Sequence, residues 1–320
     1  MMGSGAGDPS EFETTPKSLP AKVSLSSTRN VISASPYPKI TPMKISGRPF
    51  STSNSRADTL FISHGFQNYD YIDTYITREN CEEYRQFGYT RTGIYHMKMP
   101  RYGDFFALCI MEKDTTWTVL QKRSGTEIPF WNRTFEEYAN GFGSLSSDHW
   151  LGLDRVNSYI KRGHQLVLRI VLYHDLCDEK GKCSALGSQA HWWADWDFKI
   201  ADKAQKYKLS VAPTFSGNLT DPLKDPLLWL NNGQPFTTVD SDNDKHRSTN
   251  CALYRKFGGW WHKDCTLVAL NGEHGQILPT SRARGMHWTY QATSTKGKKK
   301  NTIVSYVIKP KYSLMMFRFK

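Results

Sequence analysis

The chain of 320 residues contains no uninterrupted apolar run near the roughly 20 residues that a membrane-spanning helix needs, so we expect no membrane insertion. It also lacks the H-E-x-x-H, G-x-S-x-G and P-loop patterns, which are common sequence signals of zinc proteases, serine hydrolases and nucleotide hydrolases. Histidines such as His149 and His164 have no nucleophile or carboxylate partner at a meaningful spacing. We therefore expect a protein that is not an enzyme.

Acidic residues are missing from one end of the chain. The last 39 residues contain ten Lys or Arg and no Asp or Glu, whereas the rest of the chain is nearly balanced, so this end supplies most of the formal charge of +12. The run KGKKKN (296–301) could attract sulfated polysaccharide or another anionic surface by charge alone. We expect no specific nucleic-acid binding, and we assign residues 313–320 to a basic C-terminal tail.

The cysteines show no C-x-x-C spacing, which favours three disulfides over a zinc site or a redox motif and leaves fifteen pairings open. Two Asn-x-Thr sequons, at Asn132 and Asn218, agree with a glycoprotein that is secreted through an oxidising route. The N-terminus has no apolar signal-like region, so the chain is a fragment, its start is misassigned, or the cysteines are reduced. The six cysteines are Cys81, Cys109, Cys177, Cys183, Cys251 and Cys265.

Residues 1–78 are rich in Ser, Thr, Pro and Gly without a sustained period, which is typical of a disordered arm or linker. Heptads and Gly-x-y repeats are absent, so no trimerising stalk is visible, although assembly of a homo-oligomer through this arm stays open. From RENCEEYRQFG onward, aromatic segments punctuated by Gly indicate a packed domain.

Two short helices and several strands are predicted in that domain. Thr134 and Glu137 form a capping-box pattern before a stop at Asn140 and Gly141, and Asp154 and Gly163 bracket a second helix as cap and terminator. HQLVLRIVLY alternates like a half-buried strand, and TTWTVLQKR, KYKLSV and NTIVSYVIK resemble it. The expected class is α+β with an antiparallel sheet, not a doubly wound fold.

The segment TTVDSDNDKHRSTNC places carboxylates at Asp240, Asp242 and Asp244. An EF-hand is excluded, because the sixth and twelfth positions counted from Asp240 hold Lys245 and Cys251 instead of Gly and Glu. Carboxylates two residues apart in an irregular loop can converge on one cation, and backbone carbonyls can complete its shell of six to eight oxygens. A solvated acidic turn is the alternative.

The motifs RTGIYHMKMP, FFALCIMEKDTTWTVLQKRSG, FWNRTFEEYANGFG, LVLRIVL, ADWDFKI, FTTVDSDNDKHRSTNCA, GGWWHKDC, GMHW and YVIKP follow one another at plausible spacing. This order resembles the fibrinogen-like globular domain of fibrinogen chains, ficolins, tachylectins, angiopoietins and tenascins, over residues 79–312. The resemblance implies a central antiparallel sheet, few short helices and a loop-rich subdomain that binds calcium and ligand.

The resemblance also implies the pairings Cys81 with Cys109 and Cys251 with Cys265, which leaves Cys177 for Cys183. The alternative for the last pair is a zinc site with His174 and His191, whose spacing matches no common structural site.

For the acidic loop, the resemblance implies a Ca2+ site with the side chains of Asp242 and Asp244 and the backbone carbonyls of His246 and Ser248 as ligands. Asp240 would then be a turn or outer residue. His246 and Arg247 stand where many relatives have an aromatic and a small or acidic residue.

In the family, a ligand pocket lies beside the calcium loop. Thr266 occupies the position of a His in acetyl-binding members, and Arg282, Ala283 and Arg284 replace their Tyr-containing turn. Two arginines suit sialylated, sulfated or carboxylate groups better than neutral acetylated sugars. The expected pocket residues are Tyr254, Trp261, Asp264, Cys265, Thr266, Arg282 and Ala283.

Some aromatic residues near this pocket have a second interpretation. Trp260 and Trp261 could belong to the core instead of the pocket wall. We interpret Trp196 and Phe198 of HWWADWDF as core residues and not as a stacking surface.

Two functions follow from the resemblance. The first is an extracellular, calcium-dependent, lectin-like module that binds glycans or anionic polysaccharide, as in innate immunity. The alternative is a ligand for a cell-surface receptor or the extracellular matrix, without sugar binding.

Overall fold

The computed structural model describes residues 69–125, 128–178, 183, 190–265, 267–275, 284–294 and 302–320. Within these residues, no helix is long and apolar enough to cross a membrane. Residues 1–68 of the predicted arm, the basic run 296–300 and three predicted pocket residues lie outside the described residues. These three are Thr266, Arg282 and Ala283.

The larger sheet has ten strands in the described part of the chain, and all its strand pairings are antiparallel. This confirms the predicted α+β class. Along its main path the strands are β1 (Gly93–Met99), β2 (Gly103–Met111), β3 (Thr116–Arg123), β14 (Tyr312–Phe319), β6 (Leu166–Tyr173), β8 (His191–Ile200) and β10 (Ser216–Gly217). Beside this path lie β4 (Phe142–Gly143), β5 (His149–Trp150) and β9 (Leu209–Val211).

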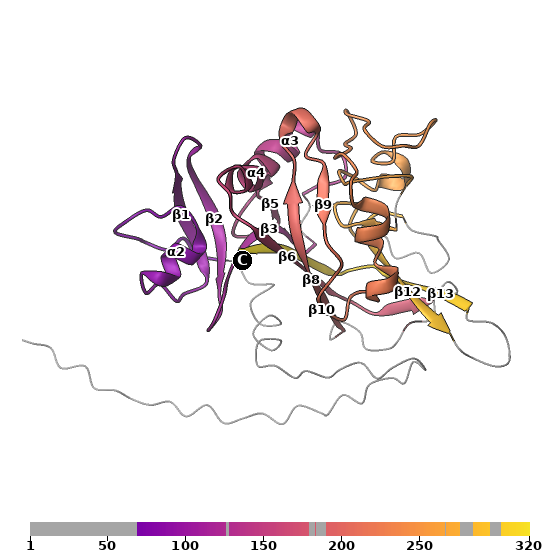
Figure 1. The fold of residues 1–320 in the computed structure, drawn as a ribbon, viewed down its shortest axis with the longest axis horizontal. Helices are drawn as coiled ribbons and strands as arrows, with labels where there is room; N and C mark the ends of the chain where they lie inside the picture. Colours follow the sequence, from indigo (N-terminus) through magenta and orange to yellow (C-terminus); the bar gives the residue numbers. More distant parts are fainter. Residues whose placement is uncertain are drawn as a thin grey trace, which may run out of the picture. The chain divides into compact units, whose positions relative to one another are not determined.

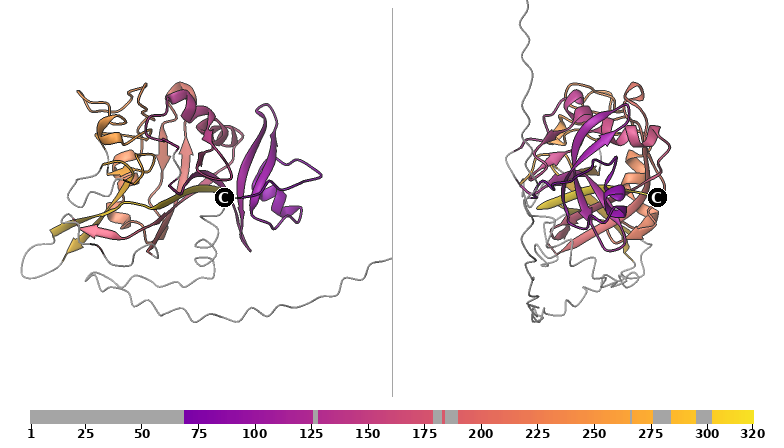
Figure 2. Two further views of the ribbon diagram at one scale, coloured as in Figure 1. Left: turned by 180° about the vertical axis from the view of Figure 1, so that it is seen from behind. Right: turned by 90° about the vertical axis from the view of Figure 1, so that its left-hand side faces the viewer.

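A smaller antiparallel sheet contains β11 (Val268–Ala269), β12 (His287–Ser294), β13 (Thr302–Ile308) and β7 (Leu176–Asp178). Strands β12 and β13 pair antiparallel from Trp288 with Ile308 to Ser294 with Thr302. Figure 1 and Figure 2 show β1 and β2 at one end of the molecule and the β12–β13 hairpin at the other.

Helix α3 (Phe135–Asn140) begins as its sequence predicts. The Thr134 side chain accepts a hydrogen bond from the Glu137 backbone, and the Glu137 carboxylate accepts one from the Thr134 backbone, so both halves of the capping box form. The helix ends at Gly141, whose φ of 93° is a left-handed value. The other helices are α2 (Cys81–Gln86), α4 (Leu153–Lys161), the 3-10 helices η2 (Lys203–Gln205), η3 (Pro222–Lys224) and η5 (Tyr254–Lys256), and the π-helix η4 (Leu227–Asn231).

Gly163 follows the C-cap residue of helix α4 with a φ of 91°, in agreement with its prediction as terminator, but the helix does not begin with Asp154 as its cap. Gly152 occupies the cap position with a φ of 110° and no side-chain hydrogen bond, and Asp154 lies in the first turn. A Cβ at Gly152 would lie 2.8 Å from the carbonyl of Asn140, so close packing of α4 against the end of α3 requires glycine. Asp154 instead accepts a hydrogen bond from the Tyr207 hydroxyl at 2.6 Å.

The assignment of residues 313–320 to a basic tail is wrong. Residues 312–319 form β14, which lies in the middle of the sheet between β3 and β6. Met315 and Phe317 are buried on one face, and Leu314 and Met316 are buried on the other. A strand covered on both faces is apolar without alternation, and the flanking Lys and Arg residues obscured this pattern.

Strand β6 is also covered on both faces, so its description as half-buried is wrong. Leu168 and Ile170 face the core that contains α3 and α4, whereas Val167 and Val171 belong to a second apolar cluster on the opposite face. On that second face, Arg169 forms a bidentate ion pair with Asp195 of β8, with both N–O distances 2.7 Å. The Arg169 guanidinium also lies 4.5 and 4.4 Å from the ring centroids of Trp117 and Trp193.

The folded domain begins before residue 79. Tyr69 is buried, and residues 70–78 run beside β1, with Tyr71 bridged to Ile94 and Arg78 bridged to Met97. The Lys98 backbone N–H donates to the Arg78 carbonyl at 2.8 Å. These contacts correct the predicted boundary, which rested on composition alone.

Candidate functional site

The acidic loop, residues 240–250, lies at the end of the molecule opposite β1 and β2 (Figure 1). Its base is fixed by paired backbone bonds between Thr237 and Trp260, of 2.9 and 3.1 Å. Farther along, the Lys245 N–H donates to the Lys263 carbonyl at 2.7 Å. The loop is thus anchored to the segment that precedes Cys265.

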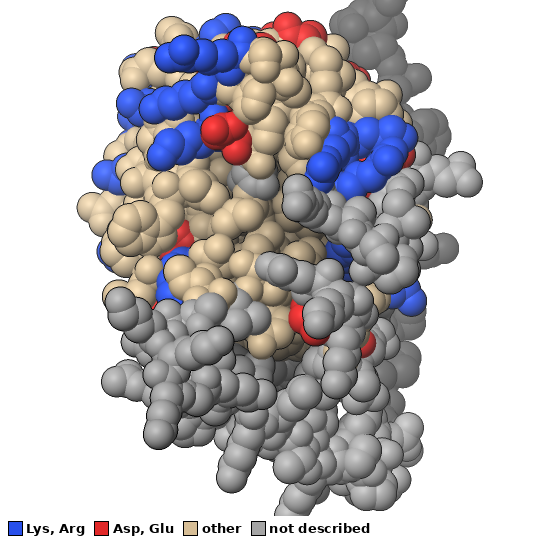
Figure 3. All heavy atoms as spheres, turned by 90° about the vertical axis from the view of Figure 1, so that its right-hand side faces the viewer, with Lys and Arg blue, Asp and Glu red and all other residues tan. Residues whose placement is uncertain are grey.

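On this side of the molecule, Lys and Arg side chains gather in two groups and few acidic side chains are visible (Figure 3).

The three aspartates of the loop have different environments. One Asp240 oxygen accepts hydrogen bonds from the Phe135 backbone N–H at 2.8 Å and from the Thr238 hydroxyl at 2.7 Å. Asp240 therefore connects the loop to the first residue of α3.

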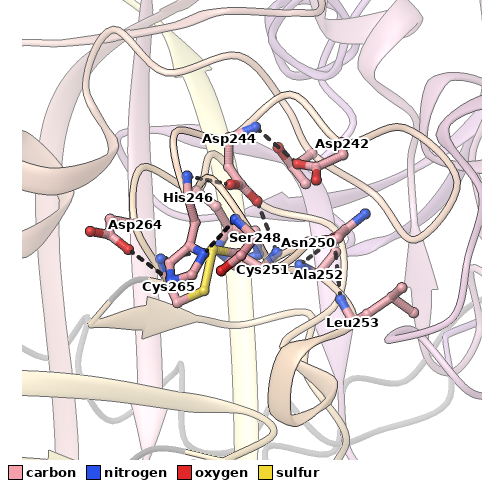
Figure 4. The surroundings of a disulfide bond; sticks show 12 residues. Asp242, Asp244, His246, Ser248, Asn250, Cys251, Ala252, Leu253, Asp264 and Cys265 are labelled. Carbon is pink, nitrogen blue, oxygen red and sulfur yellow. Dashed lines mark hydrogen bonds and ion pairs between the residues drawn. A yellow bond between two sulfur atoms is a disulfide. The ribbon is translucent and has the colours of Figure 1, made fainter.

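Asp242 and Asp244 lie next to each other (Figure 4). The exposed Asp242 carboxylate accepts from the Asp244 N–H at 3.4 Å. The half-buried Asp244 carboxylate accepts from the backbone N–H groups of His246 and Cys251, both at 2.8 Å. Burial raises the pKa of Asp244, and the nearby charge of Asp242 raises it further. Two adjacent carboxylates, one of them partly desolvated, form a donor set that a divalent cation would stabilise.

Two asparagines hold this loop in place, and the sequence analysis did not single them out. Asn243 donates to the Phe236 carbonyl at 2.8 Å, and Asn250 donates to the Thr238 carbonyl at 2.9 Å. The Asn250 side-chain oxygen also accepts from the Ala252 N–H at 2.8 Å. Asn between acidic residues and turns is the available signal, because its side chain commonly bonds nearby backbone.

The disulfide between Cys251 and Cys265 closes the far side of the loop, as the resemblance implied. Asp264 lies 3.8 Å from the His246 imidazole, and with Cys265 they form the one group of three potential metal-ligating side chains in the described residues. The Cys265 sulfur is bonded to Cys251 and is not a thiolate, so these three residues do not make a metal site.

The other two implied disulfides are present as well, between Cys81 and Cys109 and between Cys177 and Cys183. The zinc alternative for the last pair is therefore wrong. All six cysteines are paired, which fits an oxidising compartment.

The predicted pocket residues separate into two groups. Tyr254 is 39% exposed beside the loop, whereas Trp261 is fully buried and its indole N–H donates to the Tyr207 carbonyl at 2.8 Å. A ligand cannot reach a buried ring, so Trp261 belongs to the core and not to the wall of a pocket. Trp196 and Phe198 are likewise buried in the main core, as expected.

Residues 255 and 256 connect Tyr254 to the segment that carries Arg284. Both have left-handed φ values, 53° for Arg255 and 55° for Lys256. The Arg255 carbonyl accepts from the Gly285 N–H at 2.9 Å, and Lys256 forms an ion pair with Glu273. No local sequence signal marks Arg and Lys for this conformation, since glycine or asparagine is usual there.

The two sequons differ in accessibility. Asn132 is exposed. Asn218 is half-buried, and its amide bonds to β8, accepting from the Trp193 N–H at 2.9 Å and donating to the His191 carbonyl at 3.2 Å.

A fold of this kind, with its disulfide-closed loop subdomain, defines the class of fibrinogen-like globes. The family model for the C-terminal globular domain of fibrinogen beta and gamma chains matches residues 77–311. The chain belongs to this family.

Several relatives and solved structures are similar to this chain. Human angiopoietin-related protein 6 is 32% identical over 66% of this chain and 41% of its own length. Ryncolin-4 of Cerberus rynchops is also 32% identical, over 65% of this chain and 55% of its own length. The chain thus spans about half the length of the curated relatives it matches. The fibrinogen-like globe domain of human ANGPTL6 has a TM-score of 0.57 at 27% identity, covering 77% of this chain and 97% of that structure.

Proposed function

We propose that this chain is an extracellular recognition module that binds calcium and uses the surface beside the calcium loop to bind a ligand. The adjacent carboxylates of Asp242 and Asp244 in a disulfide-closed loop carry the proposal. The side chains of these two residues and the backbone carbonyls of His246 and Ser248 would hold the ion. Bound calcium would neutralise the two carboxylates and fix the loop. The exposed Arg247 lowers the expected affinity, because its charge repels the cation.

The ligand class we propose is an anionic glycan. Lys245 and Arg247 are exposed on the loop, and neither forms an ion pair with another residue that the structure describes. The gathering of Lys and Arg on this side of the molecule adds support (Figure 3). Sialylated, sulfated or carboxylated groups fit such a surface by charge and by bidentate hydrogen bonds to Arg.

A receptor or matrix protein is the second candidate partner, and one observation favours it. Leu253 and Tyr254, directly after Cys251, are 52% and 39% exposed. Exposed apolar side chains beside an ordered loop suit a protein interface better than a purely polar glycan surface.

A glycan array probed with the full chain, in calcium and in chelator, tests the proposal. We expect acidic glycans to bind in calcium and to lose binding in chelator, with neutral acetylated sugars weaker throughout. Preferential binding of neutral acetylated sugars would refute the anionic assignment. Absence of any glycan binding, together with saturable binding to cells that is lost in Leu253→Ser, would favour the protein partner.

A further inference from the structure

The disulfide between Cys177 and Cys183 lies in the segment that connects β6 to β8. Strand β6 pairs with β8 along its whole length, and the last pair before this segment is Tyr173 with His191. Directly beyond that pair, the His174 backbone N–H donates to the Ala190 carbonyl at 3.2 Å. Backbone pairing therefore holds the two ends of the connection together, before the disulfide is reached.

Further contacts fix this connection without the disulfide. Leu176 and Ala190 are buried in the main core, and Leu176 and Cys177 of β7 pair with Ile308 and Val307 of β13. The disulfide joins residues six positions apart, whereas the other two disulfides join residues 28 and 14 positions apart. A shorter crosslinked loop restricts the unfolded chain less, so we expect this disulfide to contribute the least of the three to stability.

The three disulfides also differ in how easily a thiol can reach them. Cys183 is exposed and Cys177 is half-buried. In the pair Cys81 and Cys109, both residues are at most 1% exposed, and the Thr118 hydroxyl donates to the Cys81 sulfur at 3.1 Å. The disulfide that closes the acidic loop has one fully buried and one half-buried residue. Because exchange requires a thiolate to reach a sulfur atom, Cys183 offers the best access of the six cysteines.

Exposed disulfides that stabilise a fold little are the ones that exchange with thiols, whereas structural disulfides resist reduction. The contacts and the access described above give the Cys177–Cys183 disulfide both properties. We propose that this disulfide is a thiol-exchange site, and that its substrate is the dithiol of a reducing protein. This inference goes beyond the binding function proposed above and uses no residue of the calcium loop.

The exchange begins when one thiolate of the dithiol attacks the exposed Cys183 sulfur. The bond from this sulfur to Cys177 breaks, Cys177 leaves as a thiolate that is then protonated, and a mixed disulfide joins Cys183 to the reductant. The second thiolate of the reductant attacks the reductant sulfur of the mixed disulfide and releases Cys183 as a thiolate, which is also protonated. Two electrons thus pass from the dithiol, which becomes a disulfide, to the two cysteines, which become thiols.

A monothiol is a poorer substrate for such a site. The β-bridge between Cys177 and Cys183 keeps the Cys177 thiolate beside the mixed disulfide, where it can expel a monothiol and restore the original bond. The second thiolate of a dithiol competes with this return, because its attack is also intramolecular. Net reduction therefore favours a dithiol.

The test incubates the full, oxidised chain with reduced thioredoxin, which thioredoxin reductase and NADPH regenerate. Samples are stopped with acid, free thiols are alkylated, and the remaining disulfides are then reduced and alkylated with an isotopically heavy reagent. Peptide mapping by mass spectrometry gives the reduced fraction of each cysteine with time. We expect Cys177 and Cys183 to be reduced together, at least about tenfold faster than the other four cysteines, while the near-UV circular dichroism stays unchanged. Glutathione at the same thiol concentration should leave this pair mostly oxidised.

Two double variants are matched to each other. Cys177→Ser with Cys183→Ser should keep the near-UV spectrum and melt close to the wild type. Cys81→Ser with Cys109→Ser should melt much lower, because its disulfide joins α2 to β2 within the main core. The labelling of the wild type needs neither variant, so it tests the proposal even if the second variant does not fold.

Reduction of all three disulfides at one rate, or earlier reduction of either of the other two, would overturn the proposal. A Cys177→Ser with Cys183→Ser variant that melts as low as the other double variant would show that this disulfide is structural. Glutathione that reduces the pair as fast as thioredoxin would refute the dithiol as its substrate. These measurements contain neither calcium nor glycan, so failure of the binding function proposed above would leave them unaffected.

Discussion

Replacement of each aspartate of the acidic loop by asparagine should give a different result, because the three side chains have different partners. Asp242 is exposed, and its carboxylate accepts a long hydrogen bond of 3.4 Å from the Asp244 N–H. Asp242→Asn should therefore leave the free energy of unfolding in chelator nearly unchanged and remove the increase that calcium provides. A single Asp240 oxygen accepts from the first residue of α3 and from Thr238, and an asparagine oxygen can keep both bonds. Asp240→Asn should therefore lower stability in chelator less than Asp244→Asn does and retain most of the calcium effect.

The expected size follows from linkage. Calcium at a hundred times its dissociation constant adds about 2.7 kcal/mol to the free energy of unfolding if it binds only the folded state. For a domain of roughly 240 residues, each kcal/mol corresponds to about 2–4 °C in Tm, so the wild type should melt about 5–11 °C higher in calcium.

Asp244→Asn should lower the free energy of unfolding both in calcium and in chelator. Its carboxylate accepts backbone N–H groups of His246 and Cys251 on separate oxygens, and an asparagine amide nitrogen cannot accept the second. Leaving that N–H without a partner costs about 1–3 kcal/mol, in addition to the lost calcium effect.

Thermal melts of the four proteins in calcium and in chelator measure both quantities, with magnesium as the control ion. A wild type whose Tm does not respond to calcium would refute the calcium site. An Asp242→Asn variant that keeps the full calcium shift would refute the ligand set, even if calcium binds elsewhere.

Burial lowers the pKa of His262 from 6.5 to about 4, so the folded-state pKa lies below the unfolded value. The free energy of unfolding should therefore fall as pH drops from about 6.5 to 4, by up to about 1.4 kcal/mol per pH unit for this group. His262→Gln should flatten that part of the pH profile measured by urea denaturation. An unaltered slope in the variant would contradict the lowered pKa of His262. Asp195→Asn should lower the free energy of unfolding by about 3 kcal/mol, because its arginine partner on β6 stays largely buried. Glu136→Gln breaks an exposed pair and should lower the free energy of unfolding much less. Similar losses in urea denaturation would argue against that difference. When the protein is expressed through a eukaryotic secretory route, peptide mapping by mass spectrometry should find glycan on Asn132 and little on Asn218; the reverse occupancy would show that the amide bonds of Asn218 do not protect it.

The features predicted correctly from the sequence are those that neighbouring residues specify. The capping box of α3 needs only Thr134 and Glu137, three residues apart, and the order of motifs was sufficient for the family and its disulfides. The start of α4 was predicted incorrectly because the requirement for Gly152 comes from Asn140, twelve residues earlier in the chain. Strand β14 was assigned to a tail because its paired strands, β3 and β6, and the apolar clusters on its two faces come from segments distant in sequence.

In the acidic loop too, the sequence did not show contacts with residues that are distant in the chain. Two-residue spacing presents Asp240, Asp242 and Asp244 as equivalent, yet Asp240 bonds a helix 105 positions earlier in the chain. The family resemblance predicts a different role for Asp240 than for the other two, and in the structure its hydrogen bonds also differ from theirs. Spacing alone could not predict this difference, because the partner of Asp240 is brought to the loop only by the tertiary fold.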